Sequence, residues 1–409
     1  MVKVRFGLVT YVDEDVTVSV VGSVKELGQW NLAKAVPLHP AVPPETTEEA
    51  SFWVGDVELY KGIEPAIFQY KFVRRSTTGG GEGGDAWEWE GSGPAHNRWW
   101  IPEEEEKNMV GNGVYLTPVA AWKEPDGDPH TLEHTASFYY TICDSRTMHY
   151  SEVVENLWVG SCPRIPAHIT HGMKTALGVT AVINLQREED VCADSAGCCP
   201  GVPSTDVPDS LSQLYKDHGI SYVWIPANDW DPRSKVGVLP AAVYKLWELL
   251  KTGHHVYVYC NAGIIRSVLI VCGYLYYVLG WPYRVMEYHV CSQRPVAYVD
   301  QDIILRAEKE FQDKFGSDVL AERCTESPRS YQPQPPPKIP AIQAPQTEQN
   351  VEVGQVVNDE DPSEDKKVEV GQVVEGEDSS EDHFVAKTKI VLRRTVDFPS
   401  EEEKDVELE

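Results

Sequence analysis

Residues 256–267 carry side chains whose types and spacing fit phosphate chemistry. An apolar run at 256–258 predicts a buried strand, Cys260 follows it, and Arg266 comes six residues after the cysteine, before an apolar segment of helix length. A loop that joins a strand to a helix N-terminus gathers backbone N–H groups and the positive end of the helix dipole. The pattern therefore predicts a phosphate-binding loop with the thiol of Cys260 at its base, facing the phosphate.

The positions of this loop have distinct expected roles. Arg266 would clamp two phosphate oxygens, and the same positive field favours Cys260 as a thiolate nucleophile. Ser267 would stabilise that thiolate or assist the second step, and Gly263 would allow the tight turn. The other loop positions expected to surround the phosphate are Asn261, Ala262, Ile264 and Ile265.

A leaving alkoxide needs a proton, so an acid must lie on a neighbouring loop. Asp229 follows a predicted strand about thirty residues before the cysteine and is the preferred candidate, with Asp231 as its rival. The alternative interpretation is that Cys260 is a buried small apolar residue and Arg266 an ordinary arginine at a helix start.

Composition limits the class of protein. The net charge of the 409 residues is −28, which argues against nucleic acid as a partner. The 9 cysteines lack zinc-site spacing and indicate reduced thiols in a cytoplasmic protein, and the predicted mechanism needs no metal or cofactor. The most apolar run, at 268–280, is too short to span a membrane.

The chain divides into three parts by pattern. Residues 1–123 contain short alternating runs separated by glycine and proline turns, which predicts an all-β antiparallel sandwich. Residues 135–320 alternate strand-like and helix-like runs, which predicts an α/β domain with a largely parallel sheet. Residues 325–409 are acidic, repeat the segment 351–357 at 368–374, and are predicted to be a disordered tail.

The expected elements are as follows. Strands are predicted at 16–21, 52–59, 67–73, 87–89, 181–185, 221–225 and 256–258, with a glycine-rich hairpin loop at 77–84. Helices are predicted at 210–218, 240–251, 268–279, 284–293 and 301–315, where the second domain is expected to end near residue 316.

The loop resembles the His-Cys-x-x-Gly-x-x-Arg-Ser/Thr signature of protein tyrosine and dual-specificity phosphatases. Together with residues 157–163, 294–300 and 311–316, it resembles more closely the laforin family of glycogen phosphatases. In that family a carbohydrate-binding module of family 20 precedes a dual-specificity phosphatase domain. The resemblance covers residues 1 to about 320.

The resemblance implies an activity and partners. The expected activity is removal of phosphate from glycogen or another phosphorylated glucan through a cysteinyl-phosphate. A cytoplasmic homodimer associated with glycogen is also implied, with a ubiquitin ligase and glycogen-targeting proteins as partners. Two alternatives stay open: a glycogen-binding pseudophosphatase or scaffold, and a phosphatase acting on phosphotyrosine or phosphoserine.

Sugar rings present flat apolar faces that bind exposed tryptophans. Trp30 and Trp89 lie next to glycine turns and are expected to be exposed, with the core as the alternative, which is the expected place of Trp53. The adjacent Trp99 and Trp100 would widen the aromatic surface.

The resemblance adds further sugar-binding positions. In the first domain it assigns sugar contacts to Trp30, Lys71 and Trp89 and to the loop formed by Gly93, Pro94, Ala95, His96 and Asn97, where the family carries aspartate at the last position. In the second domain it points to Asp190 and Tyr298, with Lys235 in the same cleft, although Asp190 could equally be a solvated acid.

Two positions depart from the phosphatase signature. Tyr259 replaces the histidine before the cysteine, and Ile265 replaces the small residue before the arginine. A β-branched side chain restricts the loop dihedrals and would crowd the phosphate. Both departures are expected to reduce catalysis without abolishing it, because the nucleophile and the arginine are retained.

Overall fold

The computed structural model describes residues 2–13, 15–42, 50–59, 67–76, 86–101, 109–110, 114–123 and 133–325. The predicted acidic tail and the predicted glycine-rich loop at 77–84 lie outside the described residues.

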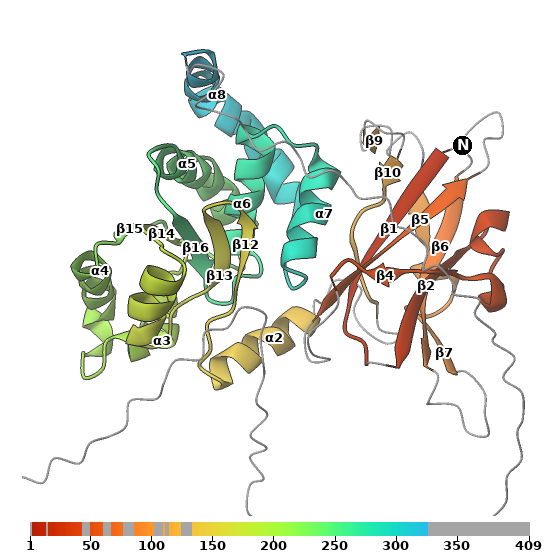
Figure 1. Ribbon diagram of the computed structural model, residues 1–409, viewed down its shortest axis with the longest axis horizontal. Helices are drawn as coiled ribbons and strands as arrows, with labels where there is room; N and C mark the ends of the chain where they lie inside the picture. The colour runs from red at the N-terminus through yellow and green to blue at the C-terminus, as the bar shows by residue number, and fades with distance from the viewer. Residues whose placement is uncertain are drawn as a thin grey trace, which may run out of the picture. The chain divides into compact units, whose positions relative to one another are not determined.

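The described N-terminal strands form two sheets (Figure 1). The first has the order β4-β5-β1-β10-β9, and β11 also pairs with β1; the second has the order β3-β2-β6-β7, and β8 pairs with β6. The bounds are β1 (Val2–Thr10), β2 (Val16–Gly22), β3 (Val36–Pro37), β4 (His39–Pro40), β5 (Ser51–Leu59), β6 (Phe68–Ser76), β7 (Ala86–Trp89), β8 (Arg98–Trp100), β9 (Met109–Val110), β10 (Val114–Leu116) and β11 (Ala120–Ala121).

Alternate side chains of these strands fill one apolar core, which confirms the predicted sandwich. Phe6 and Phe72 are fully buried, and Trp53 lies in the same core as expected. The expectation for Trp99 and Trp100 is half wrong: Trp99 is 57% exposed, but Trp100 is only 2% exposed and stacks on Phe68 in the core. Adjacent residues of a strand face opposite sides, so the two rings could not widen one surface.

The second domain is built on a single sheet with strand order β12-β13-β16-β14-β15. Only β12 runs antiparallel to its neighbour; the other pairs are parallel, as the alternating pattern predicted. The bounds are β12 (Tyr150–Val154), β13 (Leu157–Ser161), β14 (Ala181–Asn184), β15 (Ser221–Trp224) and β16 (Val256–Cys260).

Helices cover both faces of this sheet (Figure 1). One face packs against α5 (Pro232–Lys251), α6 (Arg266–Gly273), the π-helix η8 (Tyr274–Val278), α7 (Tyr283–Gln293) and α8 (Gln301–Thr325). The other face packs against the π-helix η5 (His168–Ala176), α3 (Glu188–Asp194) and α4 (Val207–Asp217), and α2 (Glu133–Asp144) precedes the sheet in the chain.

The central strand β16 divides its side chains between these two cores. Val256, Val258 and Cys260 belong to the core beneath α5 and α6. Tyr257 and Tyr259 belong to the core beneath η5 and α4. The alternation of a strand therefore puts the cysteine and the tyrosine that precedes it on opposite faces of the sheet.

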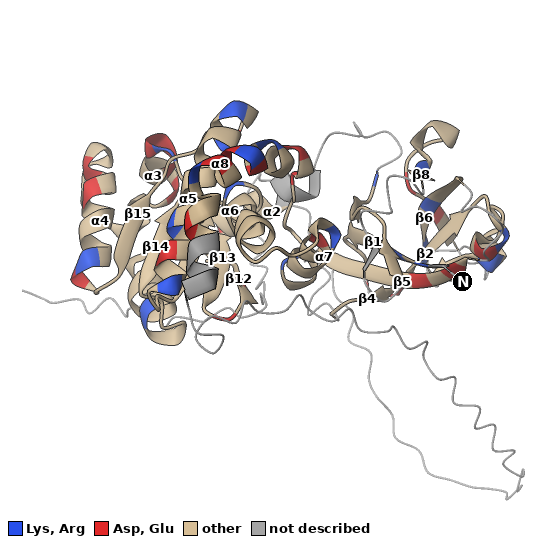
Figure 2. Cartoon of the chain, turned by 90° about the horizontal axis from the view of Figure 1, so that it is seen from above, with Lys and Arg blue, Asp and Glu red and all other residues tan. Residues whose placement is uncertain are grey.

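Charge is mixed along the outer helices. Helices α4 and α8 each carry acidic and basic side chains (Figure 2), and on α8 the ion pairs Arg306–Asp302 and Lys314–Glu310 have i,i+4 spacing. Among the described residues, no helix is both long and apolar enough to cross a bilayer.

Several helix bounds differ from the prediction. Helix α5 begins at Pro232, capped by Asp231, and Pro240 lies inside it rather than at its start. A proline is favoured in the first turn of a helix. In the sequence, Pro232 and Pro240 fit that rule equally well, so the rule alone could not show which one begins the helix. Helix α8 continues past residue 316 to Thr325, the expected helix at 268–279 is split into α6 and η8, and α2, α3 and η5 were not predicted.

The neighbouring pair Trp99 and Trp100 gives a direct test of the sandwich core. Replacing Trp100 by alanine should lower the free energy of unfolding by about 3–5 kcal/mol, because it empties a buried aromatic site. Replacing the exposed Trp99 by alanine should cost about 0.5 kcal/mol or less. Denaturant titration of the full chain measures both, and equal losses would contradict the core placement of Trp100.

Candidate active site

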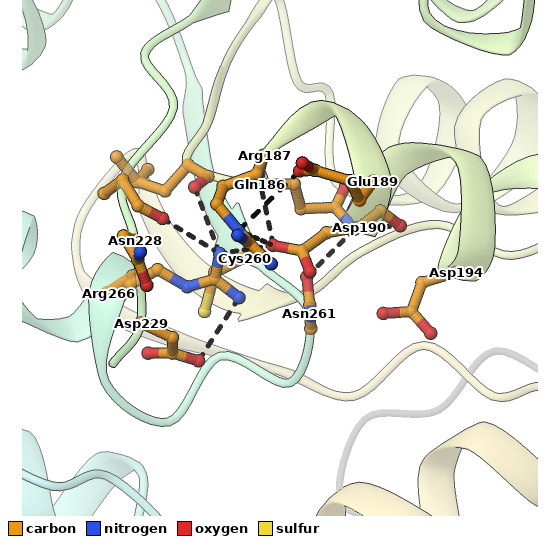
Figure 3. Close-up of polar contacts among 12 residues, drawn as sticks. Gln186, Arg187, Glu189, Asp190, Asp194, Asn228, Asp229, Cys260, Asn261 and Arg266 are labelled. Carbon is orange, nitrogen blue, oxygen red and sulfur yellow. Dashed lines mark hydrogen bonds and ion pairs between the residues drawn. The ribbon is translucent and has the colours of Figure 1, made fainter. Parts of the chain in front are cut away.

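The nucleophile candidate lies at the end of the central strand. Cys260 closes β16 and is only 3% exposed, and its Sγ lies 3.4 Å from the Oγ of Ser267 in the first turn of α6. Helix α6 begins at Arg266, so its N-terminus faces the loop between the two elements. The structure therefore brings the predicted cysteine, serine and arginine together around one loop. Figure 3 shows Cys260 and Arg266.

Gly263 adopts a conformation that other residues avoid. Its φ is +70°, and a Cβ there would lie 2.4 Å from the carbonyl carbon of Gly160 on the neighbouring strand β13. A side chain would thus meet both backbone strain and a backbone clash. The glycine allows the loop to turn close against β13.

The Arg266 guanidinium is buried among acceptors (Figure 3). Its Nη1 donates to Asp190 Oδ2 at 2.7 Å, to the Ala227 carbonyl at 3.2 Å and to the Leu185 carbonyl at 3.4 Å. Its Nη2 lies 3.3 Å from Asp229 Oδ2. Its Nε is buried without a hydrogen-bond partner among the described residues, which leaves one donor for a phosphate oxygen.

The geometry separates the two acid candidates. Asp231 caps α5, where its Oδ1 accepts from the backbone N–H of Arg233 at 2.9 Å. Asp229 instead lies against Arg266, and its Oδ1 is buried without a partner among the described residues. Lys235 is 8% exposed, and its ammonium donates a hydrogen bond to the backbone carbonyl of Asp229 at 2.9 Å. This contact fixes the backbone of the loop that carries Asp229.

Asp190 is engaged with the phosphate loop rather than free in solvent. Its burial opposes ionisation, but the hydrogen bond and charge of Arg266 outweigh this effect and lower the pKa of Asp190. Burial acts against the charge of Arg266, but the charges of Cys260 and Asp229 and the contact with Asp190 raise its pKa. The sequence resemblance suggested a sugar contact for Asp190; its nearest described charge partner is the arginine.

A buried arginine that the sequence did not single out supports the loop. Arg294 has no exposed surface and donates from Nε to the Gly263 carbonyl at 2.6 Å and from Nη2 to the Ala262 carbonyl at 2.9 Å. Its Nη1 lies 2.8 Å from His149 Nδ1, and burial together with this arginine lowers the pKa of His149. Its signal in the sequence was its place at the start of residues 294–300, which carry part of the family resemblance.

The two departures from the signature are placed differently. Tyr259 is fully buried on the face opposite Cys260. Ile265 has φ −117° and packs as a half-buried side chain against the core, so its position does not need the left-handed conformation of a glycine.

Aromatic side chains lie next to the loop. Tyr298 is 37% exposed, and its backbone N–H donates to the carbonyl of Ile264 at 2.9 Å. Trp230, which follows the acid candidate Asp229, is 90% exposed. Trp230 was not predicted as a site residue, although its place beside the acid was a signal.

Trp30 and Trp89 form an aromatic pair, called here the tryptophan platform. Their ring centroids are 6.4 Å apart at an interplanar angle of 42°, and both rings are partly exposed. Gln29 and Trp30 have backbone φ angles of 51° and 65°, which residues other than glycine rarely adopt. The strained turn places the Trp30 ring beside the Trp89 ring. Both rings were expected to be exposed, and both are partly exposed.

Lys71 lies behind this platform and is 4% exposed. Its ammonium donates to the carbonyls of Glu90 at 3.1 Å and Gly93 at 2.8 Å, and burial lowers its pKa. It thereby anchors the start of the loop at 93–97, where Asn97 donates from Nδ2 to Gln69 Oε1 at 2.9 Å. The middle of that loop is a short 3-10 turn in which Pro94 and Ala95 are exposed and His96 is half-buried.

Gly263 can be tested against a glycine of matched backbone conformation. Gly280 has φ +69° and open space where a Cβ would lie, so Gly280→Ala should cost about 1–2 kcal/mol of unfolding free energy from backbone strain alone. Gly263→Ala adds the clash with Gly160 and should cost clearly more. Urea titration of both variants measures the difference; equal costs would contradict the close contact.

Two protein-family models match the two domains. Residues 1–109 match the starch binding domain family, and residues 157–304 match the catalytic domain of dual specificity phosphatases. Glucoamylase-1 of Arthroderma benhamiae is 41% identical over 75 residues, which are 18% of this chain and 11% of that protein. A crystal structure of PTPMT1 covers 43% of this chain and 99% of its own at 19% identity and a TM-score of 0.32.

Laforin of Mus musculus matches across both domains. It is 42% identical over 308 residues, which are 72% of this chain and 90% of laforin. With a starch-binding sandwich followed by a dual-specificity phosphatase domain, this chain belongs to the laforin family.

Proposed function

We propose that this protein removes phosphate monoesters from glucan chains such as glycogen, through a cysteinyl-phosphate on Cys260. The observation that carries the proposal is the convergence of three groups on one loop. Cys260 supplies the thiol, Arg266 holds an unpartnered Nε, and Asp229 holds an unpartnered Oδ1, each among the described residues. These are the nucleophile, the phosphate clamp and the proton donor that the reaction requires.

In the first step the Cys260 thiolate attacks phosphorus and forms an S–P bond while the P–O bond to the sugar breaks. Asp229, in its protonated form, gives its proton to the departing sugar oxygen. The loop amides, Arg266 and the start of α6 stabilise the charge on the phosphoryl oxygens. Arg294 contributes by holding the carbonyls of Ala262 and Gly263 away from the anion.

In the second step water attacks the phosphorus of the cysteinyl-phosphate. Asp229, now ionised, takes a proton from the water as the O–P bond forms and the S–P bond breaks. Ser267 lies 3.4 Å from the sulfur and stabilises the thiolate as it leaves. Inorganic phosphate is released and the enzyme returns to its starting state.

Exposed aromatic groups support a sugar substrate. The tryptophan platform belongs to the domain that matches the starch binding family. Near the phosphate loop, Trp230 and Tyr298 offer further aromatic surface, which suits the apolar faces of glucose rings. In this proposal Asp190 acts mainly by holding Arg266 in place. Lys235 acts mainly by fixing the backbone of the loop that carries Asp229.

Family membership supports further proposals about context. We infer a cytoplasmic protein associated with glycogen, which forms homodimers and contacts a ubiquitin ligase and glycogen-targeting proteins. Activity on phosphotyrosine or phosphoserine would use the same loop and the same two steps.

The catalytic proposal is tested by phosphate release from phosphorylated glycogen and from a small aryl phosphate. Wild-type protein should release phosphate from both, and Cys260→Ser should abolish release because the hydroxyl is a far weaker nucleophile at this site. Asp229→Asn should lower kcat by about 10²–10⁴-fold on a sugar ester, which needs a proton, and less on an activated aryl ester. Equal background from wild type and Cys260→Ser would instead favour a glycogen-binding scaffold.

The platform proposal is tested by retention of the full chain on glycogen. Trp30→Ala should weaken retention about tenfold or more, because it removes one of the two rings proposed to pack against the sugar. Tyr140→Ala is the control, since Tyr140 is an exposed aromatic residue of α2, outside the domain that matches the starch binding family. Unchanged retention of Trp30→Ala would refute the platform.

A further inference from the structure

Gln186 is a fully buried residue that lies two positions beyond the end of β14. Its backbone N–H donates to Asn184 Oδ1 at 2.8 Å, and its backbone carbonyl accepts from Trp224 Nε1 at 2.7 Å. A side-chain amide without exposed surface costs free energy unless it is hydrogen-bonded as well. The partners of this amide therefore indicate what Gln186 does.

The side-chain amide of Gln186 joins two segments of the phosphatase site (Figure 3). Its Nε2 donates to Asn261 Oδ1 at 3.1 Å and to the backbone carbonyl of Asp190 at 3.4 Å. Its Oε1 accepts from the hydroxyl of the buried Ser195 at 3.4 Å. The nitrogen has two N–H groups and two acceptors, so the amide is satisfied at both ends.

These partners determine which way two amides face. A backbone carbonyl can only accept, so the carbonyl of Asp190 requires the nitrogen of Gln186 and not its oxygen. Asn261 must then turn its oxygen toward Gln186, because its own amide nitrogen would meet a donor there. The side chain of the residue that follows Cys260 is thereby held in one orientation.

Asp190 carries the connection on to the phosphate clamp. Its carboxylate Oδ2 accepts from Arg266 Nη1 at 2.7 Å and from the backbone N–H of Arg187 at 3.1 Å. The second contact fixes the carboxylate against the N-terminus of its own helix, α3. Gln186 binds the backbone of Asp190 and Arg266 binds its side chain, so one fixed residue connects the two.

The hydrogen bonds form a closed ring around the phosphate loop. The ring runs from Asn261 through Gln186 and Asp190 to Arg266, and it returns along the chain through residues 262–265. Buried polar networks stabilise one arrangement when every member is satisfied, and losing one member leaves its neighbours unpaired.

We propose that Gln186 is a positioning residue, which holds Asn261 and Arg266 at a fixed separation so that the loop amides and the guanidinium bind the same phosphate. The amide of Gln186 itself touches no reacting atom. The effect on turnover rests on the proposed function, whereas the effect on anion binding does not.

The first test replaces Gln186 in the full-length protein. Gln186→Met removes the amide but keeps an unbranched side chain of similar length. It should weaken tungstate binding, measured by calorimetry, and lower kcat/KM on an aryl phosphate by about fivefold to tenfold, the effect of one lost hydrogen bond.

Tyr277→Phe is the matched control. It removes a buried hydroxyl that donates to the Ile304 carbonyl, outside the ring. Both variants should lower the free energy of unfolding, because each loses a buried hydrogen bond to a carbonyl. Only Gln186→Met should lower tungstate affinity, which a merely structural role of Gln186 would leave unchanged.

Asn261→Ala opens the same ring from the loop side, at a half-buried position. It should weaken tungstate binding by a similar factor, and the double variant with Gln186→Met should lose no more than about the larger single loss. Tungstate affinity of either single variant equal to that of Tyr277→Phe, or fully additive losses, would overturn the proposal.

Two further outcomes are also decided by tungstate binding. If Gln186→Met does not fold, the comparison of Asn261→Ala with Tyr277→Phe decides whether the ring positions the loop. If wild type shows no turnover that depends on Cys260, the proposed function fails, and tungstate affinity alone decides the role of Gln186.

Discussion

The buried charge of Arg266 is the constraint on which the phosphatase site depends. A guanidinium with almost no exposure is stable only if its N–H groups find acceptors, preferably charged ones. The acceptors come from the segments that follow two parallel strands: Leu185 and Asp190 after β14, and Ala227 and Asp229 after β15. Neutralising one cation therefore holds three loops at the carboxyl ends of adjacent strands.

The burial of Arg266 also explains why some of its N–H groups bind the protein while another has no protein acceptor among the described residues. Nη1 of Arg266 is fully engaged by protein acceptors, while Nε has none among the described residues. One side of the guanidinium thus fixes the arginine, and the other remains for a phosphoryl oxygen. Arg294 acts in the same way on the far side of the loop, where it binds carbonyls that would otherwise repel an anion.

Local patterns were sufficient to predict the two folds and that Cys260, Gly263 and Arg266 lie together around one loop. The strand, Cys260, the glycine turn and Arg266 are neighbours in the chain, so their geometry follows from short-range rules. The partners of Asp190, Arg294 and Tyr259 could not be predicted in the same way, because their contacts join residues about 30 to 80 positions apart. A helix cap such as Asp231 and an acid such as Asp229 look alike in the sequence, and only the fold separates them.

In the sandwich domain, too, a buried cation fixes the backbone by donating hydrogen bonds to acceptors; here the cation is Lys71. The ammonium of Lys71 is buried against the carbonyls of Glu90 and Gly93, which fixes the chain just after Trp89. Trp30 is presented by a turn with two positive φ angles, a strain that the surrounding backbone must sustain. In both domains a buried cation fixes the backbone. The proposed ligand groups lie beside it: aromatic rings for sugar, and for phosphate an Nε without a partner among the described residues. The proposed substrate, a glucan phosphate ester, carries both features, so the proposal requires rigid positioning at each site.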